Sequence, residues 1–80
     1  MALAKQNLGL DLDTPTAIQT ALSMAARFGF DDEFRGVKHV ATGLEIIQAI
    51  GCSNWRMGHK RYLRSAYQAG RFSAQMTMEG

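Results

Sequence analysis

The chain has 80 residues, nine of them Lys or Arg and seven Asp or Glu, and its formal net charge is +2. A chain of this length forms one small domain that buries only about 60–65% of its unfolded surface, so its core is marginal. The single cysteine, Cys52, excludes an internal disulfide framework and favours a reducing compartment, with the cytoplasm as the expected location. No signal-peptide pattern or membrane-length apolar run is present, so we expect no membrane partner.

Charge is distributed unevenly along the chain. Residues 1–33 carry two basic and five acidic side chains, whereas residues 34–80 carry seven basic and two acidic ones. Such an asymmetry steers a protein toward an anionic partner, and it would equally let two copies associate head to tail. Because the core is also marginal, the sequence predicts self-association, most simply as a homodimer.

Residues 1–13 are predicted to form an extended arm. Leu8, Leu10 and Leu12 alternate with other residues, which is the pattern of a strand. No clear second strand follows in the chain, so we expect the arm to lie over the core or across a partner. The three leucines would then be apolar contacts in need of cover.

The first helix is predicted to begin after Thr14, its expected N-cap, and to stop at Gly29. Pro15 suits the first helical position because its missing N–H is not needed there. The apolar positions in between share one face and are typical of core packing. They are Ile18, Ala21, Leu22, Ala25 and Phe28.

A second helix is predicted from about Gly43 to Ile50. Thr42 and Glu45 have the spacing of a capping box, in which each side chain satisfies a backbone N–H of the other residue. Gly51 is the expected end of this helix.

The third helix is predicted to be capped by Ser53 or Asn54 and to run to about Ala69 or beyond. Residues 75–80 are expected to be a frayed tail. The basic side chains of the third helix recur at spacings of three, four and seven residues. They therefore share one flank of that helix, which we expect to be exposed. They are Arg56, Lys60, Arg61, Arg64 and Arg71, with no acidic residue between Ser53 and Phe72.

Together these elements predict an all-α fold. The expected architecture is a small bundle of three to four short helices in residues 14–74, preceded by the extended arm. The helices capped by Thr14 and Ser53 should be the longest. The expected core residues are Ile18, Leu22, Phe28, Leu44, Ile47, Trp55 and Tyr62.

The helix ending at Gly51, the turn through Ser53 and the basic helix after it resemble the helix-turn-helix motif of DNA-binding proteins. That resemblance implies that residues 53–64 read DNA, with Asn54, Arg56, Lys60 and Arg61 near bases or phosphates. The motif covers about twenty residues. A plain αα-hairpin without a DNA role fits the same turn chemistry.

No residue pattern indicates catalysis, a metal or a cofactor. Cys52 and His59 are seven residues apart, and a zinc site would need His39 and a fourth ligand that the sequence does not supply. A Cys–His nucleophilic pair is conceivable, but an inert, buried cysteine is the more common arrangement. The glycines are dispersed and form no phosphate-binding loop. We therefore expect a protein that is not an enzyme.

Two binding functions remain. The first is a small module whose basic helix binds nucleic acid or a nucleoprotein. Its candidate contact residues are Asn54, Arg56, Lys60, Arg61, Arg64 and Arg71. The alternative is a protein-binding inhibitor or adaptor of the phage or mobile-element type, for example an anti-defence protein. It would block a host protein with an acidic surface, or its nucleic-acid-binding surface, through the same cations. Its apolar anchors would be Leu8, Leu10 and Leu12.

Overall fold

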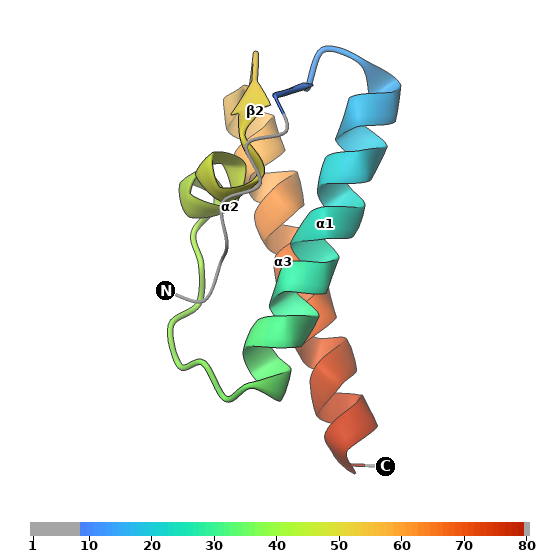
Figure 1. The fold of residues 1–80 in the computed structure, drawn as a ribbon, viewed down its shortest axis with the longest axis vertical. Helices are drawn as coiled ribbons and strands as arrows, with labels where there is room; N and C mark the ends of the chain where they lie inside the picture. Colours follow the sequence, from blue (N-terminus) through green and yellow to red (C-terminus); the bar gives the residue numbers. More distant parts are fainter. Residues whose placement is uncertain (1–8, 80) are drawn as a thin grey trace.

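The computed structural model describes residues 9–79, and these are mainly helical, which confirms the predicted all-α fold (Figure 1). Two short strands accompany the helices. In chain order the elements are β1 (Leu10–Asp11), α1 (Pro15–Phe34), α2 (Gly43–Ile50), β2 (Cys52–Ser53) and α3 (Met57–Glu79). As predicted, the two longest helices are α1, which follows Thr14, and the basic helix α3.

The two long helices run side by side in the same direction (Figure 1). Ile18 and Leu22, early in α1, lie beside Leu63, early in α3. Glu33, near the end of α1, pairs with Arg71 in the second half of α3. Parallel neighbours need a long connection, and residues 35–56 provide it by returning to the starting end with α2 packed against α3.

Small side chains let α1 and α3 approach closely. They recur every four residues, as Ala21, Ala25 and Gly29 on α1 and as Ala66, Gly70 and Ala74 on α3. A Cβ atom at Gly29 would overlap the backbone carbonyl of Tyr67, and one at Gly70 would overlap that of Ala26. The predicted stop at Gly29 is therefore wrong. This glycine serves helix packing, and α1 continues to Phe34.

Both predicted ends of α2 are confirmed. The Thr42 side chain accepts a hydrogen bond from the Glu45 N–H at 3.2 Å, and the Glu45 carboxylate accepts one from the Thr42 N–H at 2.9 Å. At the other end, Gly51 has φ 81°, the left-handed conformation that glycine adopts without strain. Contacts within a few residues thus set both ends of this helix.

Residues 9–13, the described part of the predicted arm, belong to the fold. Leu10 and Asp11 pair in parallel with Cys52 and Ser53, although the sequence showed no second strand. A strand of two residues is too short to produce a recognisable alternation, which explains the missed pairing. Leu12 is only 2% exposed and Leu10 packs against the same core, so both are internal contacts. Leu8 lies outside the described residues.

The third helix begins and ends later than predicted. Asn54 has a left-handed φ of 54°, which is incompatible with a continuous helix, so α3 begins at Met57. The N–H of Arg56 donates to Nδ1 of His59 at 3.0 Å and so is satisfied at this start. Instead of fraying from residue 75, α3 continues to Glu79.

The core contains fewer of the predicted aromatic residues than expected. Trp55, Tyr62 and Leu44 are 40%, 65% and 38% exposed, so these core predictions are wrong. The buried side of α3 is shifted by one residue from the predicted one. Leu63 is buried in place of Tyr62, and Tyr67 lies on the same buried stripe. Ile47 is buried as predicted. The predicted residues Ile18, Leu22 and Phe28 pack partly buried against this core.

Candidate nucleic-acid interface

Three basic side chains lie on the first half of α3, and we call them the basic stripe: Lys60, Arg61 and Arg64. Arg61 and Arg64 are exposed, and Lys60 is partly exposed. Leu63, within the same turn, is 2% exposed, so the helix separates a buried side from a cationic one. This arrangement is the amphipathic helix that the sequence predicted, with the basic side chains toward solvent.

Trp55 lies next to the basic stripe, just before α3. The ammonium of Lys60 is 5.2 Å from the centre of the Trp55 ring, which is a cation–π contact. This contact holds the lysine over one face of the ring. The ring remains 40% exposed, so Trp55 adds an aromatic surface at the edge of the stripe.

The two other candidates before α3 contact the N-terminal segment. The Arg56 side chain is 79% exposed and lies 3.7 Å from the carboxylate of Asp13, a surface pair that contributes little. The Asn54 amide donates to the Asp11 carboxylate at 3.0 Å. This bond, followed by one from the Asp13 N–H, lowers the pKa of Asp11. The polar group that we expected near bases is thus engaged within the fold.

Arg71 differs from the other basic residues, because its side chain is only 13% exposed. It donates to the carbonyl oxygens of Val37 at 2.6 Å and His39 at 3.3 Å, and it pairs with Glu33 at 3.1 Å. The prediction that Arg71 is exposed is wrong. Its guanidinium instead fixes the chain between α1 and α2.

Arg71 also belongs to a buried polar network. It donates to the Tyr67 hydroxyl at 3.0 Å, and that hydroxyl donates to the carboxylate of Asp32, which is 3% exposed. Burial, followed by the bond to Asp32, raises the pKa of Tyr67, so the phenol stays protonated. Sequence spacing could not reveal this network, because Asp32 and Tyr67 are 35 residues apart.

The helix-turn-helix resemblance is limited to the order of elements. Residues 51–56 separate α2 from α3 and include β2. The motif uses a turn of about three to four residues. The connection here is longer, and it is tied to the N-terminal strand.

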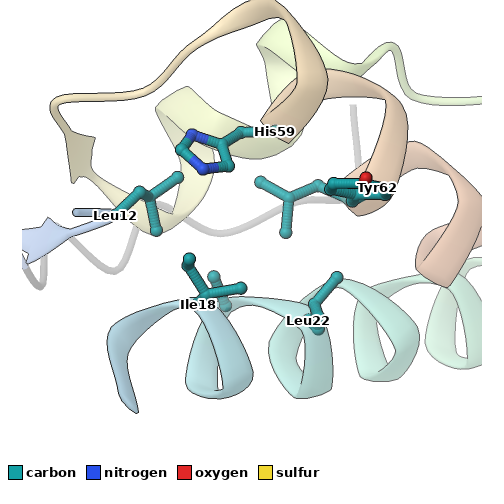
Figure 2. Close-up of a pocket in the computed structure, with 7 residues that line it drawn as sticks. Leu12, Ile18, Leu22, His59 and Tyr62 are labelled. Atoms are coloured by element: carbon teal, nitrogen blue, oxygen red, sulfur yellow. The ribbon is translucent and has the colours of Figure 1, made fainter. Parts of the chain in front are cut away.

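An apolar cavity lies where the N-terminal segment meets α1 and α3 (Figure 2). Its volume is about 10 Å³, which is room for one water at most. Small-molecule sites are about 300–1,000 Å³, so this cavity is packing space rather than a ligand pocket. Its lining comprises Leu12, Ile18, Ala21, Leu22, His59, Tyr62 and Leu63.

Reactive and metal-binding side chains are dispersed. Burial raises the pKa of the Cys52 thiol, which makes it less nucleophilic than a free cysteine. Within residues 9–79, no three His, Cys, Asp or Glu side chains gather in a way that could hold a metal ion. No helix in that part of the chain has both the length and the apolar character needed to cross a membrane.

Comparisons with family models, with curated proteins and with solved structures give no match for this chain. The basic stripe and its surroundings are therefore the basis for a functional interpretation.

Proposed function

We propose that this protein is a small, non-catalytic binding module whose basic stripe docks on the phosphate backbone of a nucleic acid or nucleoprotein. One observation carries the proposal: Arg61 and Arg64 are exposed on one helix, and neither forms an ion pair with a carboxylate of residues 9–79. Unpaired arginines on a rigid helix match phosphate oxygens well, because each guanidinium offers a fork of N–H donors.

The hydrogen bond that Asn54 forms within the fold favours phosphate contacts over base contacts at this interface. Asn and Gln read bases through their amide groups, and the Asn54 amide already bonds to Asp11. Phosphate contacts position a protein on nucleic acid without reading its sequence. We therefore propose binding with little sequence preference, supported by the exposed part of the Trp55 ring, which could stack on an unpaired base.

The buried leucines weigh against the alternative function. A protein-binding inhibitor would use the N-terminal leucines as anchors, but Leu12 is in the core and Leu10 packs against it. Leu8 lies outside the described residues, so among the predicted contacts of an inhibitor the basic stripe is the surface that the structure leaves exposed. An acidic protein partner is therefore a distinct outcome of the test below.

The test is a salt titration of binding to a short DNA duplex and to a single-stranded oligonucleotide. With about three phosphates contacted, the logarithm of affinity should fall with the logarithm of salt concentration with a slope of about −2 to −3. The double variant Arg61→Gln/Arg64→Gln should bind more weakly and show a slope of about −1.

The matched control is Arg35→Gln/Lys38→Gln, which removes the same charge from exposed positions in the chain after α1. It should leave affinity and slope nearly unchanged. Equal losses of affinity in both double variants would show that binding depends on net charge alone, and this would contradict a defined interface. If neither nucleic acid binds the protein at low salt, the proposal is wrong and an acidic protein partner becomes the better explanation.

A further inference from the structure

A shallow groove runs between α1 and α3, and no residue of α2 lines it. Its floor is made of small or apolar side chains, namely Ala26, Phe30, Ala69, Gly70 and Ser73. The Phe30 ring stacks on that of Phe34 at 6.0 Å, and Phe34 is 59% exposed. This side of the helix pair is therefore apolar at its centre, and within residues 9–79 no second layer of chain covers it.

Two opposite charges stand at the edge of this groove. Arg27 and Asp31 are both exposed and one helical turn apart, so they lie on the same side of α1. Neither forms an ion pair within the part of the chain that the structure describes. The edge thus carries one positive and one negative group four residues apart, and the two form no direct ion pair with each other.

Arg27 and Asp31 of one copy are complementary to the same two residues of a second copy when the two α1 helices lie antiparallel. A two-fold axis brings the same surface of two copies together. If two α1 helices lie antiparallel and the axis passes at the level of Gly29, Arg27 faces Asp31 of the second copy, and Asp31 faces its Arg27. A parallel pairing in register would place like charges opposite each other, which is unfavourable.

We infer that α1 is a self-association surface, through which two copies form an antiparallel, two-fold symmetric dimer. The exposed Phe34 and the Phe30 beside it gather with their equivalents and cover the groove, and two Arg27–Asp31 pairs fix the register. Apolar burial stabilises the contact, and the charges determine its orientation. The large, fully buried side chains of one copy are few, so a second copy adds substantially to the core.

This surface is independent of the proposed nucleic-acid interface. The basic stripe lies on the first half of α3, whereas the groove involves the second halves of α1 and α3. Loss of one function therefore leaves the other testable.

The test is sedimentation equilibrium of the full chain over a range of micromolar concentrations. The wild type should reach twice the mass of one chain. Arg27→Asp and Asp31→Arg should each raise the dimer dissociation constant at least about tenfold, because each places like charges opposite one another twice. The double variant Arg27→Asp/Asp31→Arg restores opposite charges and should restore the dimer.

Lys38→Asp is the matched control, since it reverses an exposed charge in the chain after α1, outside the groove lining, and it should leave the dimer intact. Phe34→Ser is a second, uncharged test and should weaken association. Circular dichroism checks that each variant is folded. A monomeric wild type overturns the inference, as does a double charge reversal that stays as weak as the single variants.

Discussion

Gly29 and Gly70 determine how closely the two long helices approach. Each faces backbone of the other helix with no room for a methyl group. At Gly58, in the first turn of α3, an added Cβ would meet no other part of the chain within 4 Å, apart from its chain neighbours and the nearby backbone of its own helix. Gly58 therefore differs from Gly29 and Gly70, although the helical positions of these three glycines look equivalent in the sequence.

Gly29→Ala should destabilise the protein by at least about 1–3 kcal/mol, the usual cost of overpacking, because the added methyl overlaps rigid backbone. Gly58→Ala should be neutral or should stabilise by up to about 1 kcal/mol, because alanine restricts the unfolded chain more than glycine does. Urea unfolding of the two variants beside the wild type measures both effects. Similar losses in the two variants would contradict close packing at Gly29.

The basic residues show what sequence spacing cannot resolve. Arg64 and Arg71 are seven residues apart and were predicted to share one exposed flank. Arg71 is instead enclosed by Glu33, Tyr67 and the carbonyl groups of residues 37 and 39. Helical periodicity gives the direction of a side chain, but only the tertiary fold determines which segment lies in that direction.

Among the helices, α2 was the one predicted correctly at both ends. Its boundaries depend on contacts within a few residues, namely the Thr42–Glu45 capping box and the left-handed Gly51. The end of α1 and the start of α3 depend instead on contacts between distant segments. Asn54 is held by Asp11, 43 residues earlier, and Gly29 is fitted to Tyr67. Sequence reasoning succeeded where the determinants were local.

The capping box of α2 should make stability dependent on pH. The Thr42 N–H, followed by His39, lowers the pKa of Glu45 below its ordinary value of 4.5. Because the pKa of Glu45 is lower in the folded state, its ionised carboxylate stabilises the fold. This stabilisation is complete when the pH is above the ordinary pKa of 4.5, and it is lost as the pH falls through the lowered folded-state pKa. Urea unfolding at about pH 7 and at about pH 3 should show less loss at low pH for Glu45→Gln than for the wild type.

A companion variant separates the two halves of the box. Thr42→Ala removes the side-chain acceptor for the Glu45 N–H and should cost about 1 kcal/mol at neutral pH. If Glu45→Gln and the wild type lost equal stability on acidification, the Glu45 carboxylate would not contribute to the cap.

At one end of the molecule, residues 10–13 connect the two long helices. The β1–β2 pairing connects the chain before α1 to the chain before α3, and Leu12 lies between the first turns of both helices (Figure 2). The described part of the predicted arm therefore lies over the core, which is one of the two expected placements, and joins the two long helices.

Leu12→Ala should cost about 2–5 kcal/mol, because Leu12 is 2% exposed. Natural domains have only about 5–15 kcal/mol of stability, so this change could unfold so small a protein. Leu44→Ala removes the same atoms at a site that is 38% exposed and should cost less. Thermal unfolding followed by circular dichroism compares the two. A smaller loss for Leu12→Ala than for Leu44→Ala would contradict the structure at this junction.

The parallel course of α1 and α3 has an electrostatic consequence. Each helix carries a partial positive charge of about half an elementary charge at its N-terminal end and a matching negative one at its C-terminal end. Side by side and parallel, the two helix dipoles add instead of cancelling (Figure 1). The positive ends thus meet at the end of the molecule where the basic stripe begins, and this end would turn toward an approaching polyanion. In an antiparallel pair of copies, the summed dipoles of the two copies point in opposite directions, so the interaction between them is attractive.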